Sequence, residues 1–148
     1  MAQFIYTEAH SSGLIARLVL GFVILPHGLQ KAFGLFGGQG FIPTLDSFDG
    51  AGISYVLGAL VIGAELLGAI GLILGVFGRL MSAGIMAVMI GAIFLRNLQN
   101  GFFMNWSGMQ EGEGIEYHLL AIGLALIVLV GGSGRFSFDR WLTNRYWD

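Results

Sequence analysis

Four long apolar runs make up most of this chain, and they restrict its fold more than any other feature of the sequence. The runs cover residues 14–36, 53–77, 80–98 and 115–131. Their lengths fall within the range of about 17–25 residues that a helix needs to cross a bilayer. The sequence therefore predicts an all-α membrane protein built as a four-transmembrane-helix bundle.

The composition separates the chain from soluble helical proteins. Apolar residues make up 55% of it and charged residues 11%, whereas soluble domains have about 25% charged residues. A soluble bundle would also show polar faces at helical spacing, but residues 80–95 contain no charged residue. Because the four runs use most of the 148 residues, we expect a single transmembrane domain over residues 1–148. The net charge of −2 argues against a nucleic-acid partner.

The absence of cysteine removes several kinds of chemistry. A chain with no cysteine has no disulfide exchange, no thiolate metal site and no cysteine nucleophile. The two histidines in the runs, His27 and His118, lack the spacing of a metal-ligand motif, so no metal site is predicted. Redox chemistry would have to belong to a cofactor or to a partner protein.

The distribution of arginine predicts the orientation in the membrane. Arg79 lies between the second and third runs, and three further arginines follow the fourth run: Arg135, Arg140 and Arg145. Positive residues accumulate on the cytoplasmic side, so we expect a multi-pass protein with both termini in the cytoplasm. The loops that contain Asp46 and Glu111 would then be external. Aromatic residues expected to anchor the cytoplasmic interface are Trp141, Tyr146 and Trp147.

Small residues predict close helix packing. In the second run, three pairs of small residues are four positions apart: Ala59 and Gly63, Ala64 and Gly68, and Gly71 and Gly75. This spacing lets helix backbones approach closely. We expect packing within the bundle, although the same pattern also suits a homo-oligomer.

Two loops are expected to contain short interfacial segments. In the loop from 37 to 52, Phe41, Leu45 and Phe48 follow helical spacing, which predicts a short helix that begins near Pro43 and lies at the interface. The stretch 101–106, which is rich in aromatic residues, is a second segment of this kind.

Polar residues of the four runs are predicted to meet in the outer half of the bundle. Arg17, His27 and Lys31 share one face of the first helix, and Glu65 lies near the middle of the second. The residues expected to form the resulting binding cluster are His27, Lys31, Glu65, Arg96, Glu116, Tyr117 and His118. Because an ionised carboxylate in hydrocarbon needs a cation or a proton, we predict that Glu65 is connected to Lys31 and to either Arg96 or His118.

Each of these residues also has a purely structural interpretation. Arg17 and Arg96 could extend to the two membrane interfaces, which is the favoured role for Arg17. Glu116 could be a favourable carboxylate at a helix amino terminus. His27 and His118 could form hydrogen bonds within the bundle, a commoner role than haem or metal ligation.

The order of these motifs resembles the DoxX family. The resemblance covers residues 14–142 and depends on short motifs in all four runs: Arg17, Gly21, His27, Gly28 and Lys31 in the first, Glu65 in the second, Arg79 opening the third, Glu116 and Tyr117 opening the fourth, and the segment 132–139 (GSGRFSFD) closing it.

The resemblance implies a four-helix protein of the bacterial inner (plasma) membrane that accompanies redox enzymes. The family includes a small subunit of archaeal thiosulfate:quinone oxidoreductase and a mycobacterial component of a membrane oxidoreductase complex. The lack of cysteine distinguishes this chain from thiol-active four-helix proteins such as vitamin K epoxide reductase.

Three hypotheses about function follow. The preferred one is a non-catalytic, auxiliary membrane subunit of a quinone-linked oxidoreductase complex, with a polar cavity that binds a quinone headgroup or supports a redox protein partner. The second is an electron-transfer protein in which His27 and His118 ligate a haem. The third is a small-molecule or proton-coupled transporter that uses Glu65.

Overall fold

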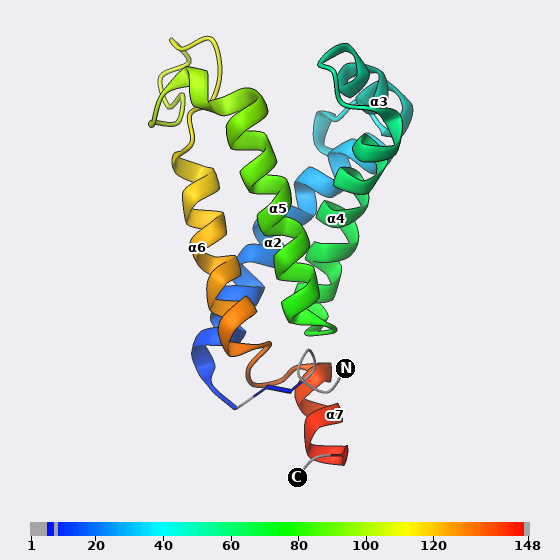
Figure 1. Ribbon diagram of the computed structural model, residues 1–148, viewed down its shortest axis with the longest axis vertical. Helices are drawn as coiled ribbons and strands as arrows, with labels where there is room; N and C mark the ends of the chain where they lie inside the picture. Colours follow the sequence, from blue (N-terminus) through cyan, green and yellow to red (C-terminus); the bar gives the residue numbers. More distant parts are fainter. Residues whose placement is uncertain (1–5, 8, 147–148) are drawn as a thin grey trace.

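The fold is a helical bundle that is narrow at one end and splayed at the other (Figure 1). The structure, a computed structural model, describes residues 6, 7 and 9–146, so the predicted anchor Trp147 lies outside the described residues. Four helices make the bundle: α2 (Ser11–Phe33), α4 (Tyr55–Leu74), α5 (Gly78–Ala92) and α6 (Glu116–Gly131). The shorter elements are η1 (Leu35–Gly37), α3 (Phe41–Gly50), the π-helical turn η2 (Ile93–Asn97), η3 (Leu98–Asn100) and α7 (Phe138–Tyr146). The described part of the chain contains no strand, as predicted.

Three of the helical segments are long and apolar enough to cross a membrane. They are Ser11–Phe33, Tyr55–Leu74 and Gly78–Asn100. The fourth, α6, has only 16 residues, or about 24 Å at 1.5 Å per residue. The chain is therefore a helical membrane protein, while the count of four spans stays a prediction.

Two glycines end helices that the apolar pattern predicts to be longer. Gly34 has φ 71° and Gly75 has φ 68°, the left-handed conformation that closes a helix. As a result, α2 and α4 end at Phe33 and Leu74, three residues before the ends of the apolar runs.

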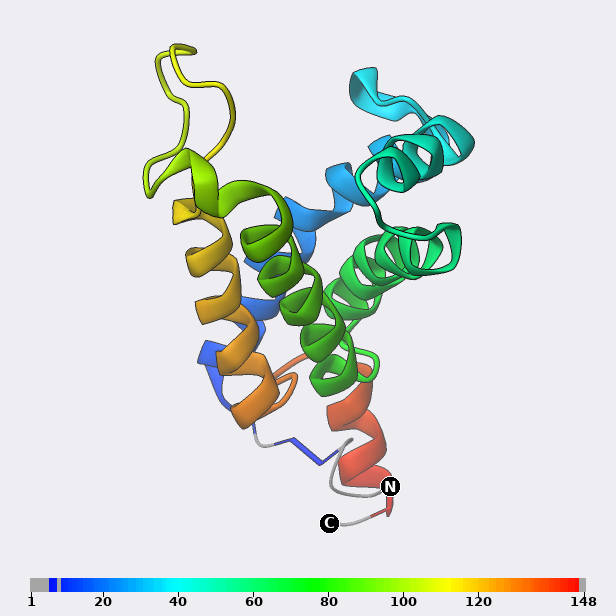
Figure 2. The same ribbon diagram turned by 45° about the horizontal axis from the view of Figure 1, so that its top comes forward.

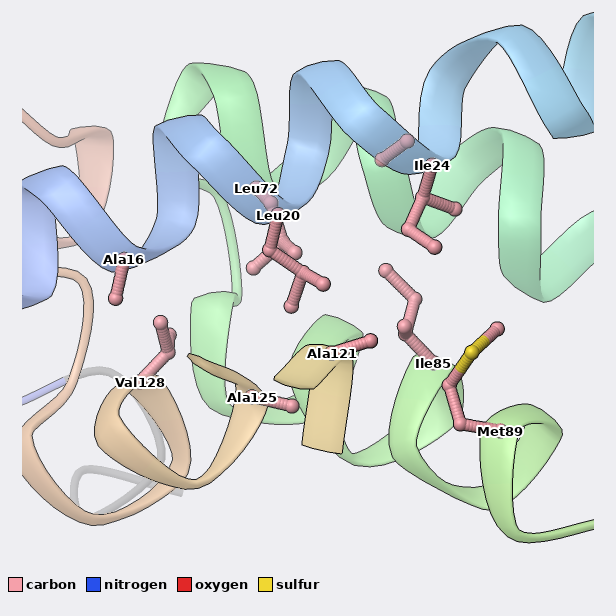
Figure 3. Close-up of a cluster of buried hydrophobic side chains, with 10 residues drawn as sticks. Ala16, Leu20, Ile24, Leu72, Ile85, Met89, Ala121, Ala125 and Val128 are labelled. Atoms are coloured by element: carbon pink, nitrogen blue, oxygen red, sulfur yellow. The ribbon is translucent and has the colours of Figure 1, made fainter. Parts of the chain in front are cut away.

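The core lies where the four helices cross. Leu20 and Ile24 of α2 point toward Ile85 of α5 and Ala121 of α6, as Figure 3 shows. Each of these side chains is buried. Since lipid is as apolar as the core, close van der Waals packing rather than the hydrophobic effect holds this centre together.

Some glycines allow close contact between neighbouring helices. A Cβ atom at Gly28 would lie 2.8 Å from Cα of Leu66, so α2 and α4 touch backbone to backbone there. Gly68 and Gly71 similarly face side chains of α5. By contrast, a Cβ atom at Gly63 would have nothing within 4 Å. Only part of the predicted small-residue pattern therefore serves packing within the bundle.

Arg17 is buried at the narrow end, here called the α7 end. Its side chain is 1% exposed, and it donates hydrogen bonds to carbonyl groups of α4 and of the 132–137 segment. The acceptors are the carbonyls of Leu72, Ile73, Ser133, Arg135 and Phe136, at 2.6–3.3 Å. The predicted extension of Arg17 to the interface is therefore wrong, because the guanidinium is buried and binds carbonyl groups at the ends of α4 and of the 132–137 segment.

Asp139 organises the same end from the other side. Its carboxylate accepts hydrogen bonds from the backbone N–H groups of Phe77 and Gly78, at 2.8 and 2.9 Å, and from Ser133 Oγ at 2.6 Å. Phe77 has φ 49°, which is unusual for a bulky residue. Asp139 thus holds a tight turn and caps the amino terminus of α5. We call Arg17, Ser133 and Asp139 the closing cluster.

At the opposite end, here called the open end, the helices separate. Figures 1 and 2 show α3 and α4 on one side and α5 and α6 on the other, diverging away from α7. The short helix α3 was expected near Pro43 and begins at Phe41. The stretch 101–106 forms no helix and lies in an irregular loop.

Candidate functional site

An ion pair between α2 and α4 lies at the centre of the candidate site. Lys31 Nζ donates to both carboxylate oxygens of Glu65, at 2.5 Å. Glu65 is 3% exposed, so it has the cationic partner that burial of a carboxylate demands. Gly28 lies one helical turn before Lys31, and its close approach to Leu66 brings the two side chains together. The predicted pairing of these residues is confirmed.

A cavity of about 300 Å³ adjoins this ion pair. It lies between α2, α5 and α6, and its volume is at the lower limit of cavities that hold small ligands, about 300–1,000 Å³. The polar residues that line it are His27, Lys31, Glu65, Asn97, Glu113, Tyr117 and His118, and the apolar ones include Ile24, Val88, Met89 and Ala92. We call it the polar cavity.

Three rings form one side of the polar cavity. Tyr117 contacts His27, with ring centroids 5.9 Å apart, and His118, with ring centroids 5.4 Å apart in an edge-to-face arrangement. Among the described residues, Tyr117 Oη and His118 Nδ1 are buried without a hydrogen-bond partner. Buried polar atoms nearly always have one. The His118 ring also interacts with the backbone of Gly114, so Tyr117 Oη is the clearer candidate for a bond to a group in the cavity.

The open-end rim of the cavity comes from residues that the sequence pattern did not indicate. Asn97, in the π-helical turn η2, donates a hydrogen bond to the carbonyl of Glu113 at 2.8 Å. Met104 and Glu113 reach the cavity from the loop before α6. A polar Asn at the end of an apolar run was a visible signal. The π-helical turn that directs it inward was not, because such turns have no simple sequence signature.

Two predicted members of the cluster lie elsewhere. Arg96 is exposed and lines a different cavity. Glu116 is the first residue of α6 and accepts a hydrogen bond from the N–H of Met104 at 3.2 Å, as expected for a carboxylate at a helix amino terminus. Within residues 9–146, no hydrogen bond connects Arg96 or His118 to the ion pair. The predicted network is thus confined to Lys31 and Glu65.

The second cavity, of about 780 Å³, is a groove between α4 and α5. Four residues line both cavities: Lys31, Glu65, Val88 and Ala92. The ion pair therefore stands where the two cavities meet. Neither the existence nor the position of this groove follows from the sequence pattern.

The residues do not fit a haem bound between His27 and His118. Tyr117 contacts both imidazole rings, so the three rings pack on one another and the imidazoles do not face an open slot. The described residues also contain no group of three or more His, Asp or Glu side chains placed to hold a metal ion. The arrangement instead suits a ligand that accepts and donates hydrogen bonds.

Comparisons with known proteins agree with the sequence motifs. The model of the DoxX family matches residues 12–98, more than half of the chain. An uncharacterized membrane protein of Mycobacterium tuberculosis is 31% identical over 157 aligned positions, which cover 97% of this chain and 88% of that protein. No solved structure matches the chain. The matched residues include α2, with Gly28 and Lys31, and Glu65 of α4, and the chain is a member of the DoxX family.

Proposed function

We propose that this protein is an integral, non-catalytic subunit of a quinone-linked oxidoreductase complex, and that the polar cavity binds the headgroup of a quinone-type ligand. One observation carries the proposal: buried Tyr117 Oη lacks a partner beside a cavity that His118 and the Lys31–Glu65 ion pair also line. A membrane protein gains little from burying unsatisfied polar atoms, which are expensive in hydrocarbon.

The chemistry of the cavity favours a neutral ring with oxygen substituents. Tyr117 offers a hydroxyl donor, and His118 Nδ1 donates or accepts according to its tautomer. Glu65 already balances the charge of Lys31, so an additional anion has no free cation there. A quinone carbonyl accepts from Tyr117, and the hydroxyl of the reduced form donates.

The protein supplies binding and orientation in this proposal, and its partner supplies the electrons. The chain has no cysteine, so its own side chains offer no dithiol couple. The transporter hypothesis would require Glu65 to exchange its partner during a cycle, and no feature of the ion pair specifically favours that.

A binding assay tests the headgroup site directly. Purified protein in lipid nanodiscs is titrated with a benzoquinone that carries no tail, followed by isothermal titration calorimetry. Loss of one neutral hydrogen bond, about 1 kcal/mol, predicts that Tyr117→Phe weakens binding about fivefold. Tyr55→Phe is the matched control, since Tyr55 donates to Asp46 outside the cavity. Equal affinity of all three proteins would overturn the proposal.

A second experiment tests the role in a complex. An affinity-tagged copy expressed in its native membrane should co-purify with an oxidoreductase. In a deletion strain, His27→Ala and Lys31→Met should impair the associated quinone-reducing activity while the protein still accumulates in the membrane. Full activity of both variants, or turnover by the isolated protein with no partner present, would contradict the subunit role.

The proposed orientation places the α7 end in the cytoplasm of a bacterium, with four spans. Arg79 at that end donates to the carbonyls of Leu129 and Val130, and Arg140 belongs to α7. Reporter fusions at the carboxyl terminus and at Gly108, in the loop of the open end (Figure 1), should report opposite sides of the membrane. The same side for both would exclude four spans.

A further inference from the structure

We infer that the groove between α4 and α5 holds the apolar tail of the ligand whose headgroup lies in the polar cavity, so that the ligand is a tailed, bilayer-soluble quinone. This inference rests on the proposed headgroup site. It adds the class of ligand and a sideways route of entry from the membrane.

The groove follows one face of each helix. On α4 it is lined by Leu57, Leu60, Val61 and Ala64, which are spaced i, i+3, i+4 and i+7, the repeat of a single helical face. The facing positions on α5 include Gly84, Ala87 and Gly91. The small α5 side chains leave the volume between the two helices open. Leu57 is 49% exposed and Leu60 is 64% exposed, so the groove opens toward the lipid.

The polar cavity and the apolar groove are continuous, so one amphiphilic molecule could place its headgroup in the cavity and its tail in the groove. They share Lys31, Glu65, Val88 and Ala92, and the groove away from these residues is almost entirely apolar. Figures 1 and 2 show that α4 and α5 diverge toward the open end. A ring that moves past the ion pair to Tyr117 would leave its tail between α4 and α5.

The shape of the groove disfavours a helix as its occupant. The carboxyl-terminal part of α3 and the turn after it, at Phe48 and Ile53, line the groove as well. A helix of a partner or of a second copy is about 10–12 Å wide with its side chains. It would have to pass α3 to lie along the groove. A flexible hydrocarbon chain has no such difficulty.

Charge disfavours a phospholipid as the occupant. Glu65 neutralises Lys31 at the junction of the two cavities, so the inner part of the groove does not attract a phosphate group. The groove's other cation is Arg96, which is exposed. A phospholipid held by Arg96 alone would leave Tyr117 Oη without a partner. We therefore assign the groove to the tail of the headgroup ligand.

The test compares two ligands on two glycine variants. A Cβ atom would have nothing within 4 Å at Gly91, which lines the groove, or at Gly123 on α6, which lines neither cavity. Gly91→Leu should therefore fill the groove without moving the backbone, and Gly123→Leu is its matched control. Binding to nanodisc-embedded protein is measured for a benzoquinone without a tail and for the same ring with a decyl tail, at equal concentrations in the bilayer.

Gly91→Leu should weaken binding of the tailed quinone at least fivefold and leave binding of the tailless quinone unchanged. Gly123→Leu should change neither. If Gly91→Leu has no effect on the tailed quinone while Tyr117→Phe still weakens both ligands, the groove inference is wrong and the headgroup proposal stands. If wild-type protein binds neither quinone, the headgroup proposal itself is wrong.

Photolabelling of wild-type protein provides a measurement that needs no variant to fold. A quinone with a diazirine in its tail should label the groove residues of α4 and α5, such as Leu60 and Ala87. Labelling confined to the exposed face of α6, at Leu120 or Ile127, would overturn the inference. So would a phospholipid that co-purifies through Arg96 and is not displaced by the tailed quinone.

Discussion

The two ends of the bundle differ in how completely their buried polar groups are hydrogen-bonded. At the α7 end, Arg17 donates five hydrogen bonds to carbonyls and Asp139 accepts three. In the described part of the chain, Arg79 Nε is the one buried side-chain nitrogen or oxygen at this end without a hydrogen-bond partner. At the open end, Tyr117 Oη has no partner among the described residues and lies beside a cavity. A closed network stabilises a fold, whereas an open one has capacity to bind.

The two ends also differ in which parts of the chain they join. The closing cluster joins the beginning of α2, the end of α4 and the segment after α6, so it ties three distant parts of the chain together. At the open end, the Lys31–Glu65 ion pair joins α2 to α4, and a hydrogen bond from Asn97 joins η2 to the loop before α6. Substitutions in the closing cluster should therefore lower stability most, whereas substitution of Tyr117 should lower ligand binding.

The largest expected effect is that of Arg17→Met. This change removes a donor from five carbonyls, of which two are buried, and the Leu72 carbonyl still accepts from the N–H of Gly75. A buried acceptor that is left unsatisfied carries a penalty of about 1–3 kcal/mol. Water would relieve part of it, so we expect a loss of at least about 3 kcal/mol in the free energy of unfolding. Unfolding of the detergent-solubilised protein by sodium dodecyl sulfate, followed by circular dichroism, measures it. Arg145→Met, at an exposed position of α7, is the control, and equal stability of both variants would contradict the role of the closing cluster.

Next in size is Glu65→Leu. Removal of one partner from a buried pair typically costs about 3–5 kcal/mol. We expect about 2–3 kcal/mol here, because the side chain of Lys31 is 28% exposed and water partly compensates its charge. Glu65→Gln should lose about 1 kcal/mol, since its amide oxygen still accepts from Lys31. The same unfolding assay distinguishes them, and a Leu variant as stable as the Gln variant would show that the ion pair is not needed for the fold.

A smaller loss is expected for Gly28→Ala. The new Cβ would lie 2.8 Å from Cα and N of Leu66, so α2 and α4 must move apart, at about 1–3 kcal/mol for overpacking. Gly63→Ala is the matched control, because its Cβ would have nothing within 4 Å and alanine favours a helix. The change in the free energy of unfolding should be negative for Gly28→Ala and positive for Gly63→Ala. Equal values would mean that the close contact at Gly28 does not set the helix spacing.

The sequence was sufficient to predict some of this arrangement. Apolar runs define α2, α4 and α5, because crossing a bilayer imposes a length. The pairing of Lys31 with Glu65 was predictable as well, since a carboxylate in hydrocarbon requires a cation and few are available. Both arguments depend only on the thickness and the low polarity of the bilayer, so they need no knowledge of the tertiary structure.

Other features depend on backbone geometry that residue patterns do not encode. Arg17 binds carbonyl groups, and every residue type has one, so no pattern marks its partners. Arg96 was placed by assuming a regular α-helix, but η2 is π-helical. The wider turn rotates the side chains relative to those before it, which brings Asn97 to the polar cavity and Arg96 to the groove.

The smallest expected effect on stability is the one that separates the two ends most sharply. Tyr117 Oη has no hydrogen-bond partner in the described part of the chain, so Tyr117→Phe removes a buried unsatisfied group and loses no bond. The free energy of unfolding should stay within about 0.5 kcal/mol of wild type or rise slightly, while the affinity for the tailless quinone falls about fivefold. Stability and binding are measured on the same preparation, so misfolding cannot account for a loss of affinity. A loss of more than about 1 kcal/mol would mean that the hydroxyl has a partner within the protein. The open end would then be a closed network like the α7 end, and the case for a binding site there would lose its main support.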